Sequence, residues 1–111
     1  MSDAGAVVAE RLTELWRKSR PTILERIASL HSVCDRLSRD PGDQAARNVG
    51  REAAHKLSGV LGVFGLPQGS AIASSIEDFF LVPTPPGPED LSTLRRQIAD
   101  LDRVIASRPG D

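Results

Sequence analysis

The chain has 111 residues and a mass of 11.9 kDa, which suits a single domain of ordinary size and leaves no room for a second. Hydrophobic residues make up 40% and charged residues 26%, a balance typical of a globular protein rather than a disordered one. The net charge of −1, with three Phe, one Trp and no Tyr, argues against a nucleic-acid-binding protein, which normally carries a basic patch and aromatic platforms.

The single cysteine and the short apolar runs are typical of a protein of the cytoplasm. The single cysteine, Cys34, cannot form a disulfide within the chain, which favours a reducing environment. The first residues do not resemble a signal peptide, and the longest apolar runs are far too short to span a membrane. We therefore expect a cytoplasmic protein without a membrane or nucleic-acid partner.

Apolar residues in the first third of the chain recur at helical spacing. One run consists of Val8, Leu12, Leu15 and Trp16, and the next of Ile23, Ile27, Leu30, Cys34 and Leu37. Pro21 lies between them, where it suits either the first turn of a second helix or a kink in one long helix. Cys34 is expected in the core, Trp16 in the core or at its edge, and His31 at the flank of this helix. An outward apolar face on the first run is able to pair subunits.

A turn at residues 40–43 precedes a third helical segment, predicted over about residues 43–64 with Asp43 as N-cap. Its apolar positions are Ala46, Ala53, Leu57, Val60, Leu61 and Phe64. Gly65 is predicted to end this helix, and Pro67 to begin a fourth segment. The apolar positions of that segment are Ile72, Ile76, Phe79 and Phe80.

A proline-rich link at residues 83–88 interrupts the helical pattern and is interpreted as a spacer rather than a PxxP ligand. The last segment begins with acidic residues and carries a stripe of Leu91, Leu94, Ile98, Leu101 and Ile105. No segment alternates with period two. The prediction is an all-α, up-and-down antiparallel four-helix bundle forming a single domain over residues 1–111, whose N-terminal helix is separate or continuous through a kink at Pro21.

A helical wheel of residues 43–64 places His55 opposite the apolar face, so that its side chain is predicted to project into solvent. Residues within about 60° of it are Asn48, Arg51, Glu52, Ser58, Gly59 and Gly62. A glycine inside a helix costs about 1 kcal/mol relative to alanine. Gly59 and Gly62 therefore indicate either close packing of a neighbouring helix or a bare surface that lets another protein's active site reach the imidazole.

Residues 53–59 read AAHKLSG and continue to Phe64-Gly65, which resembles the H-x-L-x-G signature of histidine-containing phosphotransfer (HPt) domains. The segment LPQGS at 66–70, with Ile76-Glu77 beyond, is similar to the next helix in one branch of that family. The specific match covers about residues 50–77, while the length and helical layout agree over nearly the whole chain.

The resemblance implies that His55 accepts a phosphoryl group from an aspartate of a receiver domain, or from a hybrid kinase, and passes it to another response regulator. Sensor or hybrid histidine kinases and receiver domains are the implied partners. The chain would need no cofactor of its own, because the receiver supplies Mg²⁺ and a lysine. It would be a phosphohistidine carrier rather than an autonomous enzyme.

The chain departs from the family pattern three residues after the histidine, where many members have Lys and this chain has Ser58. Lys56, to the side of the imidazole, and Ser58, whose hydroxyl is able to donate a hydrogen bond, are the supporting candidates together with Gly59 and Gly62. The expected partner-binding residues, from their place on the same helix face, are Asn48, Arg51, Glu52 and Val63.

Other chemistries fit less well. None of the nine glycines begins a P-loop, and His31, His55 and Cys34 are too few for a zinc site, so no metal ligands are predicted. The alternative function is a helical docking module that binds a receiver or a kinase without carrying phosphate.

Overall fold

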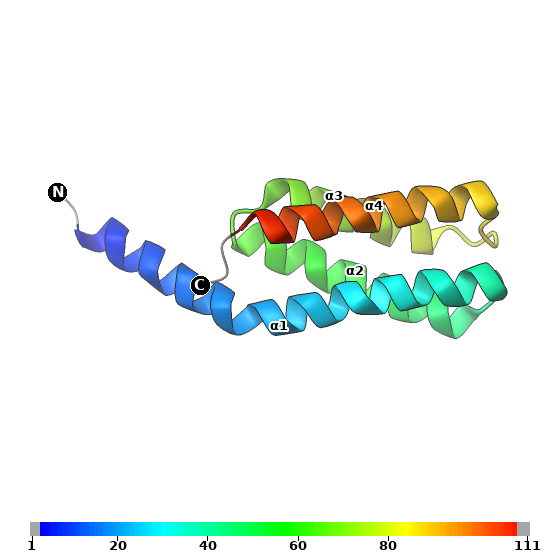
Figure 1. Ribbon diagram of the computed structural model, residues 1–111, viewed down its shortest axis with the longest axis horizontal. Helices are drawn as coiled ribbons and strands as arrows, with labels where there is room; N and C mark the ends of the chain where they lie inside the picture. The colour runs from blue at the N-terminus through cyan, green and yellow to red at the C-terminus, as the bar shows by residue number, and fades with distance from the viewer. Residues whose placement is uncertain (1–2, 109–111) are drawn as a thin grey trace.

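The computed structural model describes residues 3–108, which form four helices and no strand. The helices are α1 (Asp3–Arg39), α2 (Gln44–Val63), α3 (Pro67–Leu81) and α4 (Pro88–Ser107). Each packs against two others, α1 against α2 and α4, and α3 against α2 and α4, in an up-and-down antiparallel bundle (Figure 1). The predicted all-α fold is confirmed.

The first helix is continuous across Pro21, which decides between the two arrangements that the sequence allowed. A proline inside a helix removes one backbone hydrogen bond and favours a bend. The blue N-terminal part of α1 is inclined to the rest and extends beyond the bundle (Figure 1). Val8 and Leu15 are therefore exposed, whereas Trp16, where α1 joins the bundle, is fully buried.

The core contains most of the apolar positions that the helical period identified, together with Val33, Ala54 and Ala73, which belonged to none of the predicted stripes. From α1 it takes Trp16, Ile23, Ile27, Leu30, Val33, Cys34 and Leu37, from α2 Ala46, Ala53, Ala54, Leu57 and Leu61, and from α3 Ala73, Ile76 and Phe80. Phe64 and the α4 residues Leu91, Leu94, Ile98, Leu101 and Ile105 complete it. Val60, Ile72 and Phe79 are only partly buried at its edge. No polar or charged side chain in the described part of the chain is buried.

An aromatic and cationic cluster closes the end of the bundle from which α1 projects. The rings of Trp16 and Phe64 meet edge to face, with centroids 5.3 Å apart. The guanidinium of Arg108 lies 5.0 Å from the Trp16 ring centroid and donates a 2.9 Å hydrogen bond to the carbonyl of Phe64. The C-terminal end of α2 is thereby attached to both α1 and α4.

Both ends of α2 are determined by local interactions. The Asp43 carboxylate accepts a 2.9 Å hydrogen bond from the Ala46 amide and pairs with Arg36 at 3.1 Å. The amide hydrogen bond, followed by the attraction of Arg36, lowers the pKa of Asp43. At the other end Gly65 has a φ of 71°, and the amide of Leu66 donates to the carbonyl of Leu61. The helix is thus held at both termini.

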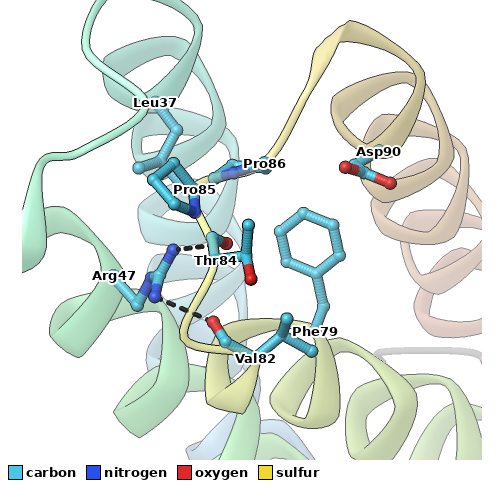
Figure 2. Close-up of a pocket in the computed structure, with 8 residues that line it drawn as sticks. All are labelled: Leu37, Arg47, Phe79, Val82, Thr84, Pro85, Pro86 and Asp90. Carbon is cyan, nitrogen blue, oxygen red and sulfur yellow. Dashed lines mark hydrogen bonds between the residues drawn. The ribbon is translucent and has the colours of Figure 1, made fainter.

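The proline-rich link lies against the bundle. Arg47 of α2 donates hydrogen bonds of 2.8 and 3.1 Å to the carbonyls of Val82 and Thr84, and Pro86 is buried (Figure 2). The link covers a cavity of about 130 Å³ lined by Leu37, Arg47, Phe79, Val82, Thr84, Pro85, Pro86 and Asp90 (Figure 2). Pro88 already belongs to the first turn of α4 and α3 ends at Leu81, so the segment between the helices is residues 82–87, shifted by one residue from the predicted link.

Two glycines of α2 are expected to respond oppositely to substitution. A Cβ at Gly50 would lie 2.5–2.9 Å from three ring atoms of the buried Phe80, whereas one at Gly59 would meet nothing within 4 Å. Gly50→Val should lower the free energy of unfolding by about 1–3 kcal/mol through overpacking. Gly59→Ala should raise it by about 1 kcal/mol through helix propensity. Urea unfolding checks both, and equal responses would contradict the assigned packing.

Candidate functional site

His55 lies near the middle of α2 on the face that points away from the core. Its neighbour Ala54 and the residue two positions on, Leu57, are fully buried, whereas the His55 side chain is 71% exposed. The backbone beneath the imidazole is consequently fixed by packing while the ring remains open to solvent. The exposure inferred from the helical wheel agrees with this placement.

The imidazole of His55 is oriented by a carboxylate from the adjacent helix. Its Nδ1 lies 2.9 Å from Oε2 of Glu77 in α3. A carboxylate can only accept, so Nδ1 carries the proton and donates it to this hydrogen bond. In the neutral ring the other nitrogen, Nε2, then carries the free lone pair. The pair therefore selects the tautomer in which Nε2 is the nucleophile.

Glu77 received no role from the sequence, although a signal for it exists. The tight connection at residues 64–66 joins α2 and α3 as an antiparallel hairpin, which places about residue 75 opposite His55. Glu77 is the first titratable residue of α3, and its side chain is only 21% exposed. The hairpin register combined with residue type would have identified it.

Lys56 does not reach towards His55. Its Nζ pairs with the Glu52 carboxylate one turn earlier at 2.8 Å, on the side of α2 that faces α1. The hydrogen bond from Lys56, then its charge, lowers the pKa of Glu52. Two of the candidates from the sequence are thus brought together with each other rather than with the imidazole.

Ser58 and the glycines contribute backbone rather than side-chain chemistry. The carbonyl of Ser58 accepts a 2.7 Å hydrogen bond from Oγ of Ser70, which attaches α3 to α2 one turn beyond His55. A Cβ at Gly62 would lie in ordinary contact with that Oγ, at 3.6 Å, while the space at Gly59 is open. Neither glycine is required by close helix packing, which favours the second interpretation, a bare surface beside the imidazole.

The remaining candidates lie on the exposed surface of α2. Arg51 and Glu52 are one turn before His55, and Asn48 accepts a 3.2 Å hydrogen bond from the Gln44 amide. Val63 is 69% exposed and, with the half-exposed Val49, adds apolar area to the surface of this helix.

The cavity beneath the link is separate from the His55 site. Arg47, which lines the cavity, precedes His55 by two turns, about 12 Å along the helix axis.

The second histidine lies elsewhere on the bundle. His31 of α1 has its Nε2 2.8 Å from Oδ2 of Asp102 in α4, and both side chains are about half exposed. Cys34 is buried, which raises the pKa of its thiol. Residues 3–108 contain no group of three or more His, Cys, Asp or Glu side chains arranged to hold a metal ion.

Within the same residues, no helix combines the length and the apolar character needed to cross a membrane. Comparison with protein families matches the Hpt domain to residues 9–104. The match covers most of the chain and includes both His55 and Glu77. No curated protein and no solved structure matches the chain.

Proposed function

Because the chain belongs to the Hpt domain family, whose members act in phosphotransfer during two-component signalling, we propose that His55 is its phosphoryl acceptor and donor. The observation that carries the proposal is the hydrogen bond from Nδ1 of His55 to Glu77, which in the neutral ring leaves the lone pair on Nε2 of a side chain that is 71% exposed. In the proposed relay a receiver-domain aspartate or a hybrid kinase donates the group, and a second response regulator receives it.

The proposed step needs no proton transfer. The lone pair of Nε2 attacks the phosphorus of an aspartyl phosphate, the N–P bond forms, and the bond between phosphorus and the carboxylate oxygen breaks. The aspartate leaves as a carboxylate, and the imidazole becomes a cation that still holds its proton on Nδ1. The Glu77 carboxylate then faces a positive ring, so its hydrogen bond becomes charge-assisted and stabilises the product.

The division of labour between the two proteins follows from what each provides. Phosphoryl transfer depends mainly on in-line positioning and on neutralising charge around the phosphorus. This chain supplies the nucleophile, an imidazole that is oriented by Glu77 on a packed helix. We assign the Mg²⁺ and the lysine that neutralise charge to the receiver. The bare surface at Gly59 and Gly62 gives the receiver access to the imidazole.

We also propose that the protein is located in the cytoplasm, as expected from the sequence.

The test is labelling of the purified chain by a receiver domain phosphorylated with radioactive acetyl phosphate in the presence of Mg²⁺. We expect rapid transfer of label that is lost in acid and stable in alkali, as phosphohistidine is, and that maps to the peptide containing His55. A panel of receivers from the source cell identifies the cognate partner and the direction of transfer. Binding to a receiver without labelling would contradict the proposal and favour the non-transferring docking module.

A further inference from the structure

The His55 site lacks a cation where the family pattern commonly places one. The position three residues after the histidine is Ser58, and the nearest lysine, Lys56, is paired with Glu52 at 2.8 Å. A phosphoryl group on Nε2 nevertheless carries about two negative charges, and transfer is favoured when a nearby cation neutralises part of them. If this chain helps to neutralise the phosphoryl group, a cationic side chain other than a lysine at position 58 must do so.

Three cationic side chains belong to α2, and two of them are engaged. Arg47 donates to the carbonyls of Val82 and Thr84, and Lys56 pairs with Glu52. The third, Arg51, is exposed, and no carboxylate of the described residues lies within 4.0 Å of its guanidinium. Its charge is available to a ligand without breaking an existing ion pair.

Arg51 is also well placed relative to the imidazole. It lies four residues before His55, and such residues are neighbours on one helix face with Cβ atoms about 5–6 Å apart. Helical side chains lean towards the N-terminus, which directs the His55 side chain towards the turn that carries Arg51. A guanidinium spans that separation and is able to bind two phosphoryl oxygens at once.

The neighbouring helices offer no equivalent cation on the Glu77 side of the imidazole. The α3 sequence, residues 67–81, contains neither Lys nor Arg. On the opposite side, Arg26 of α1 borders the groove that also holds Lys56 and Glu52. We propose that Arg51 binds the phosphoryl group on Nε2 of His55 and supplies the positive charge that the missing lysine provides elsewhere. This inference rests on the proposed function of His55.

Phosphoramidate tests the inference without an identified partner. Nε2 attacks its phosphorus, the P–N bond breaks, and ammonia leaves. Arg51→Gln should slow formation of phosphohistidine by about tenfold, the loss expected for one charge-assisted hydrogen bond. It should also move the last ionisation of the bound phosphoryl group to higher pH, which phosphorus-31 NMR follows directly. A purely structural role for Arg51 would leave this titration unchanged.

Two matched variants sharpen the result. Lys56→Gln removes an equal charge beside His55 and should change the labelling rate by less than about twofold, since a surface ion pair contributes little. Ser58→Lys in the Arg51→Gln background returns a cation to the same helix face and should restore most of the rate. Wild-type labelling and titration in Arg51→Gln, or a larger loss in Lys56→Gln, would overturn the inference.

The failure of this inference is distinguishable from failure of the proposed function. If the unaltered chain carries no label on His55, the phosphoryl-transfer proposal itself is wrong. If His55 is labelled normally and Arg51→Gln has no effect, only the role assigned to Arg51 is wrong. Unchanged thermal unfolding of Arg51→Gln is expected, because the side chain is exposed.

Discussion

Replacement of His55 by Gln is expected to abolish phosphoryl labelling by a phosphorylated receiver domain. Glutamine removes the Nε2 lone pair, which is the attacking group, so the rate should fall below detection, at least about 10³-fold. The glutamine amide is still able to donate a hydrogen bond to Glu77, and the replaced side chain is 71% exposed. The melting temperature and the helical circular dichroism should therefore remain close to those of the unaltered chain.

The matched control is His31→Gln. His31 is the other histidine of the chain and, like His55, lies next to a carboxylate of an adjacent helix, at 2.8 Å from Asp102. A variant at this position controls for non-specific labelling of an exposed imidazole and should retain the full rate. Labelling that persists in His55→Gln and disappears in His31→Gln would place the phosphoryl acceptor on α1 instead.

Replacement of Glu77 by Ala is expected to produce the second largest effect, a decrease in transfer rate of about 10- to 100-fold. The hydrogen bond from Nδ1 becomes charge-assisted as the ring gains positive charge, and such a bond contributes about 1.5–3 kcal/mol. Glu77→Gln retains an acceptor without the charge, so its rate should lie between those of Glu77→Ala and the unaltered chain.

The measurement should include the tautomer of His55, because a lower rate alone does not distinguish chemistry from unfolding. Nitrogen-15 NMR of the imidazole should report a proton on Nδ1 in the unaltered chain and a larger Nε2-protonated fraction in Glu77→Ala. Asp78→Asn removes a carboxylate from the next position of α3 and should change neither quantity. An unchanged rate and tautomer in Glu77→Ala would show that Glu77 does not position the ring.

The exposed position of His55 could be predicted from the sequence, whereas its contact with Glu77 was not, and the difference has a physical reason. The outward orientation of His55 follows from the period of a single helix, because Leu57 and Phe64 on the opposite face must be buried. Glu77 is 22 residues away, and its contact with His55 depends on the register between α2 and α3. Hydropathy within one helix carries no information about that register, which comes instead from the short turn that joins α2 to α3.

Lys56 illustrates the same limit among charged residues. Its place beside His55 on the wheel allowed it to act on the phosphoryl group, but an acceptor one turn earlier, Glu52, holds its ammonium. Exposed charged side chains are flexible, and their partners are chosen among several neighbours of similar energy. The expected contribution of Lys56 therefore shifts, in our inference, to Arg51.

By itself the sequence determined the all-α fold, the bounds of most helices to within a few residues, most of the core and the exposed position of His55. These features depend on local propensity, turn residues and the helical period, which act over a few residues. Only the tertiary structure decided that α1 continues through Pro21, that Gly59 stands in open space and that Glu77 orients the imidazole. Each of these depends on how one helix packs beside another, and that is set by contacts between residues distant in the chain.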